Sequence, residues 1–144
     1  MLTLQIPADA VTLELSNSVV WLQDGILYSR PKPGPYLVTS REQMDQEMAL
    51  LRSFIGPGKV NMLAETHPQA ESPRKEDRDY IADRLHELVK AMAIITPNAV
   101  SRMVTNLFFL FKPPSFPTKM FVNVSDARKW LQTNVTKGPD VFAL

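Results

Sequence analysis

The residues of this sequence best suited to chemistry follow directly after a short apolar run. Val60–Ala64 is succeeded by Glu65, Thr66, His67 and Pro68. A carboxylate near an imidazole can act as an acid and base pair, although no nucleophile accompanies this one. A hydroxyl at a helix N-terminus can accept phosphate, because the helix dipole stabilises the added negative charge. Thr66 can instead form a hydrogen bond within its own loop, as threonine commonly does.

Other signatures of catalysis or cofactor binding are missing. His67 and His86 could be metal ligands or bases, but they lack the short spacing of a His-Glu-x-x-His site. Gly56-Pro57-Gly58 lacks both the ending of a P-loop and the spacing of a dinucleotide fingerprint. There is no cysteine, which excludes thiolate nucleophiles and cysteine-based zinc sites. We therefore expect a non-enzymatic protein with no catalytic residue, metal or cofactor.

Composition and charge are those of an ordinary globular domain. The 144 residues are 44% hydrophobic and 22% charged, and the net charge of +1 gives no basic field for nucleic acid. The longest apolar cluster, Leu107 to Phe111, is too short for a bilayer span of about 20 residues. The first residues lack the features of a signal peptide. We expect a cytoplasmic protein without a nucleic-acid partner or a membrane span.

Before the Glu65 segment, the sequence predicts an antiparallel meander and then a helix. Residues 11–30 alternate apolar and polar positions around Asp24-Gly25, a strong hairpin signal, and predict two or three strands. Ser40 and Gln43 have the capping-box spacing, with the Gln43 side chain able to reach back to the cap. The helix they begin is closed by Gly56-Pro57-Gly58, and a strand over 59–65 follows.

After the Glu65 segment, helices and strands alternate. Ser72-Pro73 begins a second helix, on which we expect a stripe that includes Leu88 and Val89. A buried strand over 92–95 and a third helix that starts at Thr96-Pro97 come next. A last strand over 119–122 precedes a short helix capped by Ser125.

This order predicts one α/β domain over residues 1–144. We expect a mixed sheet of four to six strands and about four helices. The core should occupy residues 10–132, and residues 133–144 should form a frayed tail.

The third helix carries more apolar residues than one buried face needs. Its last turns are hydrophobic nearly all round, and such a helix cannot leave every side in water. The residues concerned are Met103, Leu107, Phe108, Phe109, Leu110 and Phe111. The Pro113–Pro117 connector and the last helix could cover the surplus within one chain. Otherwise it would form a homodimer face, a partner site or the wall of a lipid pocket.

Five segments between residues 63 and 131 carry a resemblance to a known family. They are Leu63-Ala64-Glu65-Thr66, Arg78-Asp79-Tyr80-Ile81-Ala82, Lys90-Ala91-Met92-Ala93-Ile94-Ile95-Thr96, Val100-Ser101-Arg102-Met103, and Pro114-Ser115-Phe116-Pro117-Thr118-Lys119-Met120-Phe121 with Ala127, Trp130 and Leu131. Together they resemble an uncharacterised bacterial family of STAS-like (SpoIIAA-like) proteins. That family is grouped with the lipid-binding CRAL-TRIO proteins in a wider fold class.

The resemblance implies a STAS-like fold and directs attention back to Thr66. In anti-sigma-factor antagonists, a serine at the start of the helix after the central strand is phosphorylated in an Asp-Ser-Ser-Gly-like setting. The corresponding stretch here is Glu65-Thr66-His67-Pro68, which lacks the serine pair and the glycine. Thr66 is the nearest hydroxyl.

These observations favour a cytoplasmic regulatory or scaffold module that acts through contacts with a protein partner, with a homodimer through the third helix as one form. The alternative is a carrier or sensor of a small apolar ligand or lipid, with Met103, Leu107, Phe108 and Phe111 lining the pocket.

Overall fold

The computed structural model describes residues 4–35, 37–65, 75–96 and 116–133. Its strands are β1 (Thr12–Glu14), β2 (Ser18–Gln23), β3 (Ile26–Pro31), β4 (Val60–Glu65), β5 (Val89–Ile95) and β6 (Thr118–Phe121). Its helices are α1 (Arg41–Ile55), α2 (Lys75–Leu85) and α4 (Val124–Gln132). The six strands form one sheet in the order in which they occur in the chain. β1, β2 and β3 are antiparallel and β3 to β6 are parallel, so the predicted α/β class and mixed sheet are confirmed.

The antiparallel part of the sheet depends on the Asp24-Gly25 turn. Asp24 has φ 53° and Gly25 has φ 76°, the positive values that a type I′ hairpin turn requires. The turn fixes the register, in which Gln23 pairs with Ile26 and Leu22 pairs with Leu27. The predicted hairpin is therefore confirmed.

Helix α1 begins at Ser40 and is closed by Gly56, as the sequence predicts. The Ser40 hydroxyl accepts a hydrogen bond from the Gln43 amide at 3.1 Å, and Gly56, with φ 76°, donates its amide to the Arg52 carbonyl. The other half of the predicted capping box is wrong. The Gln43 side chain donates to the Ser16 hydroxyl instead of returning to the cap.

The boundary between α2 and β5 differs from the prediction. The helix ends at Leu85, and the Leu88 amide donates to the Leu85 carbonyl in a tight turn. Val89 pairs with Val60 in the parallel ladder, where it is 1% exposed. The predicted helical stripe through Leu88 and Val89 is therefore wrong, because a β-branched residue with a buried cross-strand partner belongs to the strand.

Helix α4 is capped by Asn123 and not by Ser125, which lies inside the helix. The Asn123 side-chain oxygen accepts a hydrogen bond from the Asp126 amide at 2.9 Å. Asparagine is as good a helix N-cap as serine, so the predicted cap at Ser125 is wrong by two residues.

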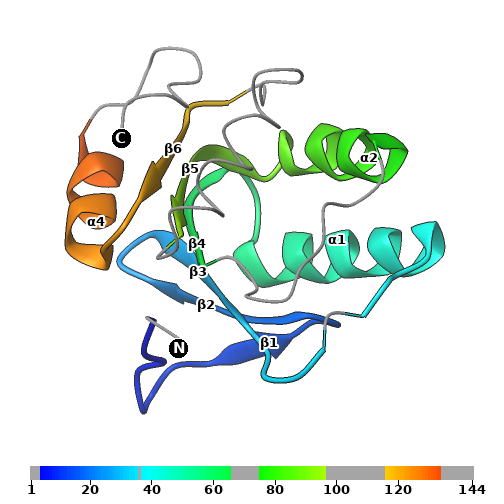
Figure 1. Ribbon diagram of the computed structural model, residues 1–144, viewed down its shortest axis with the longest axis horizontal. Coiled ribbons are helices and arrows are strands. Elements are labelled where there is room, and N and C mark those ends of the chain that lie inside the picture. Colours follow the sequence, from blue (N-terminus) through cyan, green and yellow to red (C-terminus); the bar gives the residue numbers. More distant parts are fainter. Residues whose placement is uncertain (1–3, 36, 66–74, 97–115, 134–144) are drawn as a thin grey trace.

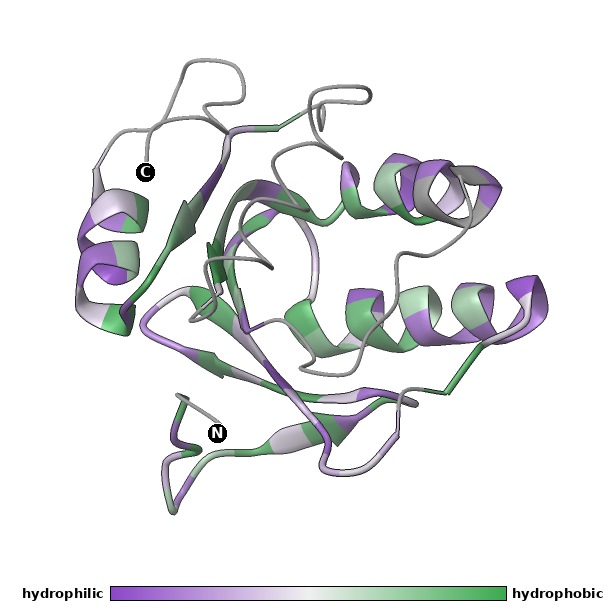
Figure 2. Cartoon of the chain, in the orientation of Figure 1, coloured by the Kyte–Doolittle hydropathy of each residue, from purple (hydrophilic) through white to green (hydrophobic). Residues whose placement is uncertain are grey.

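Helices cover both faces of the sheet, with α1 and α2 side by side on one face and α4 on the other (Figure 1). The core under α1 and α2 includes Val20, Leu27 and Leu51. The core under α4 includes Trp21 and Leu63. Figure 2 shows that α4 turns its hydrophobic side to the sheet and its hydrophilic side outward.

Further predictions lie outside the described residues. They concern the start of the second helix at Ser72-Pro73, the third helix over residues 97–111, with all its surplus apolar side chains, and the frayed tail, of which only residue 133 is described. The described part of the chain contains three helices, against about four predicted for the whole.

Candidate functional site

Glu65, the first of the candidate chemical residues, is the last residue of β4 and is buried. One of its carboxylate oxygens accepts a hydrogen bond from the main-chain amide of Leu4 at 2.9 Å. An Arg30 guanidinium nitrogen donates to the Leu4 carbonyl at 3.4 Å, and the Leu4 side chain is 2% exposed in the core under α4. Glu65 thus helps to hold an N-terminal strap, residues 4–10, on this face of the sheet.

The other members of this predicted site, Thr66 and His67, lie outside the described residues. His86 lies in the exposed turn after α2. Among the residues that the structure describes, no group of three or more histidine, cysteine or acidic side chains could hold a metal ion.

A pocket of about 250 Å³ lies on the opposite face of the sheet from the strap core, where α1 and α2 meet the ends of β3 and β4. In open α/β sheets, ligands commonly bind outside the carboxyl ends of parallel strands, which is where this pocket opens. Its lining residues are Asn17, Ser18, Pro31, Thr39, Met44, Glu47, Met48, Glu65 and Ile81.

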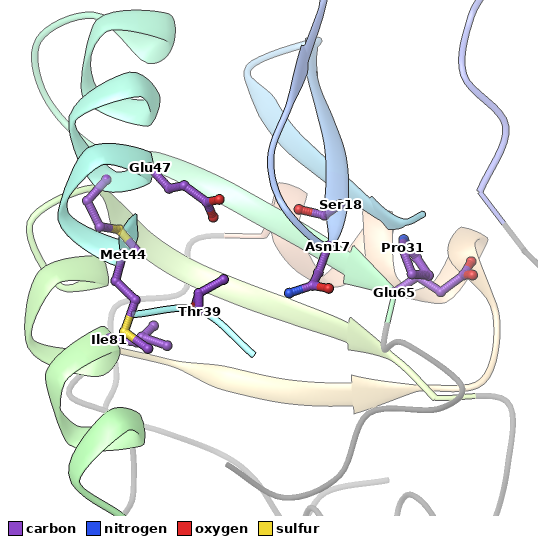
Figure 3. Close-up of a pocket in the computed structure, with 9 residues that line it drawn as sticks. Asn17, Ser18, Pro31, Thr39, Met44, Glu47, Glu65 and Ile81 are labelled. Atoms are coloured by element: carbon purple, nitrogen blue, oxygen red, sulfur yellow. The ribbon is translucent and has the colours of Figure 1, made fainter. Parts of the chain in front are cut away.

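The pocket has two unlike walls, as Figure 3 shows. Met44 and Met48 of α1 and Ile81 of α2 form an apolar wall. Asn17 and Ser18 lie across from it, Thr39 and the Glu47 carboxylate lie between the two sides in this view, and the Glu65 carboxylate points away from the methionines. The pocket is therefore amphipathic.

Two hydrogen bonds from Ser16, one from its amide and one from its hydroxyl, hold Glu47 in place. One carboxylate oxygen, Oε2, accepts from the Ser16 amide at 2.9 Å and from the Ser16 hydroxyl. Both bonds use the same oxygen, which leaves Oε1 of Glu47 without a hydrogen bond to the described residues. Among the described lining residues there is no lysine or histidine that could act with it.

The Asn17 amide, in contrast, bonds through both its nitrogen and its oxygen to the chain before α1, and so holds the β1–β2 turn there. Its nitrogen donates to the Leu37 carbonyl at 2.8 Å and its oxygen accepts from the Leu37 amide at 2.7 Å. Asn17 therefore shapes the polar wall more than it offers groups to a ligand.

A charged cluster next to the pocket joins α1 to α2. The Tyr80 hydroxyl donates to Asp45, and the Arg84 guanidinium lies 3.4 Å from the centre of the Tyr80 ring while also pairing with Asp45 at 3.3 Å. Arg41 covers the ring at 4.2 Å. The hydrogen bond to Asp45 is the largest cause that raises the pKa of Tyr80 above 10.0, followed by burial. Tyr80 therefore stays a hydrogen-bond donor at neutral pH.

Met44, Met48 and Ile81 are apolar positions of two helices, and nothing in their spacing connects them with a site. They meet Ser18 and Thr39 only after the chain folds, and no short motif joins these positions. The one local signal was Glu47, a carboxylate three residues after Met44 on a helix side that faces the sheet.

Together these features define an α/β protein with an amphipathic pocket at the carboxyl ends of its parallel strands. Residues 20–135 match the family model described as a domain of unknown function, DUF7793, and the chain belongs to this family. No curated protein and no solved structure matched the chain. None of the described helices has the length and the apolar run needed to cross a membrane.

Proposed function

We propose that this protein is a non-enzymatic binding module that holds a small amphipathic ligand in the pocket between α1, α2 and the β1–β2 turn. The observation that carries the proposal is the pairing of a Met44–Met48–Ile81 wall with hydroxyl groups and an inward-directed carboxylate. Ligand pockets typically combine an apolar surface with a few polar groups that fix orientation. The carrier or sensor hypothesis thus gains a second location, distinct from the third helix.

The lining also indicates the chemistry of the ligand. At about 250 Å³ the pocket is smaller than the roughly 300–1,000 Å³ typical of drug-sized ligands. The Glu47 carboxylate favours a cation or an N–H donor and disfavours carboxylates and phosphates. Methionine side chains adapt to irregular apolar shapes. A small primary amine with a short aliphatic or aromatic body fits these conditions.

A set of small aliphatic and aromatic amines, with the corresponding carboxylic acids as a matched series, tests this proposal. Binding is measured by ligand-observed NMR. The amines should bind. Glu47→Gln can still accept hydrogen bonds from Ser16 but should weaken amine binding about tenfold, because a charge-assisted hydrogen bond to the ligand is lost. Glu42→Gln removes the same charge from an exposed position on α1 and should change nothing.

A second pair of variants tests the location. Thr39→Trp should fill the pocket and abolish amine binding, whereas Val38→Trp places the same side chain on a residue that is 88% exposed and should leave it intact. Equal binding by these two variants, or no binding by any amine, would refute the pocket proposal.

A regulatory role in the cytoplasm through a protein partner is the second candidate function, together with the STAS-like assignment. The antiparallel β1–β3 meander followed by parallel strands and helices supports the fold assignment, and exposed apolar residues such as Leu50 support the role in protein contacts. Thr66→Glu should abolish capture of the partner if Thr66 is a regulatory phosphoacceptor. Unchanged capture by the folded variant would remove Thr66 from the mechanism.

A further inference from the structure

Three apolar side chains, one on α1 and two at the outer strands of the sheet, are exposed next to the side of α1 that faces away from α2. Val11 is 76%, Leu22 38% and Leu50 48% exposed. Because Thr12 pairs with Trp21, the preceding residue Val11 lies across from Leu22 on the neighbouring strand. Leu22 lies two residues after Val20, which is buried under α1, so both strand residues point to the α1 face of the sheet.

Contacts of α1 show that Leu50 belongs to the same region. Gln43 and Glu47 both contact Ser16, between β1 and β2, so this side of α1 overhangs the outer strands. Leu50 follows Glu47 by three residues and lies on the same side of the helix, one turn further along. Val11, Leu22 and Leu50 together are called the flank patch.

The outward strip of α1 beside the flank patch carries no charge; the carboxylate of Glu47, on the sheet side of Leu50, is bonded to Ser16. Gln46, Ala49 and Ser53 are all exposed, although the solvent side of a surface helix normally carries charged residues. The charged residues lie at the two ends of this strip, with Glu42 at the start of α1 and Lys59 just after its last turn.

We propose that the flank patch and the uncharged strip of α1 form a homodimer interface, in which the α1 helices of two copies pack antiparallel about a twofold axis. A twofold interface places the same surface on both partners, so its centre must tolerate its own copy. A strip without charge meets this condition. The antiparallel arrangement also brings Glu42 toward Lys59 of the other copy, whereas a parallel one would place like charges together.

The size of the surface explains why both parts are needed. Stable interfaces bury roughly 800 Å² on each partner, about a tenth of the 8474 Å² of this chain. A helix of 15 residues is only about 22 Å long and cannot supply that area alone. The edge of the sheet with Val11 and Leu22 supplies the remainder.

Sedimentation equilibrium of the full chain over a range of concentrations tests the interface. The wild type should dimerise, and Leu50→Glu should weaken the dimer at least about tenfold, because each copy would bury a charge at the centre. Ser53→Arg, at an exposed position of α1, should also weaken the dimer. Val38→Glu adds the same charge to an 88% exposed apolar residue outside the interface and should leave the dimer unchanged.

Charge reversal tests the antiparallel geometry. Glu42→Lys and Lys59→Glu should each weaken the dimer several-fold, and the double variant should restore it. A wild type that stays monomeric, a dimer insensitive to both Leu50→Glu and Ser53→Arg, or one broken only by Phe108→Asp would overturn the proposal.

Discussion

Replacement of Glu65 by leucine should release the N-terminal strap while the rest of the fold stays intact. Leucine has nearly the volume of glutamate but cannot accept the hydrogen bond from the Leu4 amide, which is buried in the folded protein. The Arg30 contact to the Leu4 carbonyl, at 3.4 Å, is long and holds the strap only weakly. Of the two polar contacts described for Leu4, the one to the buried carboxylate is thus the stronger.

The size of the effect follows from the state of the Leu4 amide. A buried donor without an acceptor costs about 1–3 kcal/mol. If the strap detaches, the Leu4 amide bonds to water and the buried leucine side chain becomes exposed. The loss of stability in the variant therefore cannot exceed the stabilisation from burying that leucine, about 1.5–3 kcal/mol. We therefore expect the free energy of strap opening to fall by about 2 kcal/mol, a roughly 30-fold increase in the open population.

Hydrogen–deuterium exchange of a peptide covering residues 4–10 measures this opening directly. Exchange there should accelerate about 30-fold in Glu65→Leu, while peptides from β5 should exchange as in the wild type. Glu65→Gln is the matched control, because its amide oxygen still accepts from Leu4, and it should accelerate exchange less than about fivefold. Unchanged exchange at residues 4–10 in Glu65→Leu would refute the anchoring role.

Three further predictions concern turns and helix contacts. Arg52→Ala removes hydrogen bonds of 2.7, 2.8 and 2.7 Å to the Gly56, Gly58 and Glu87 carbonyls. It should lower the free energy of unfolding, measured by urea denaturation, by about 1–3 kcal/mol. A decrease of less than about 0.5 kcal/mol would show that water replaces these contacts. Gly25→Ala, at φ 76° with nothing within 4 Å of the new Cβ, should lose about 1–2 kcal/mol from backbone conformation alone, measured as a lower melting temperature. Asp45→Asn should bring the Tyr80 pKa down toward 10.0 in an alkaline absorbance titration with Tyr80→Phe as reference. The sign follows from the raised pKa, since the Tyr80 hydrogen bond contributes below pH 10.0 and is lost as the pH rises through the folded-state pKa.

The parts of the fold that could be predicted from sequence are those determined by neighbouring residues. Asp24-Gly25 specifies a hairpin wherever it stands between β-prone runs, and Ser40 satisfies the first amides of α1 from three residues away. Val89 was misplaced because its cross-strand partner, Val60, is distant in sequence and outweighs the helical spacing before it.

The candidate site depended on long-range contacts and was therefore less predictable. Glu65 stands beside a threonine and a histidine in the sequence, yet its carboxylate accepts from the amide of Leu4, 61 residues away. The pocket brings Thr39, Met44 and Ile81 together from a loop and two helices. No spacing within one segment could have indicated that meeting.

The order of the strands in the sheet also bears on how this protein folds during synthesis. Because β1 to β6 are neighbours in the order in which they are made, each new strand can add to the edge left by the previous one as the chain emerges from the ribosome. The β2–β3 hairpin can close within microseconds, whereas each parallel strand must wait for its connecting segment. The strap is an exception, since Leu4 is made early but docks on Leu63, Ala93 and Leu131, which emerge much later. A nascent chain of which only residues before 60 have emerged should therefore carry the hairpin with a free strap, and closure of the strap should report that the later elements have docked.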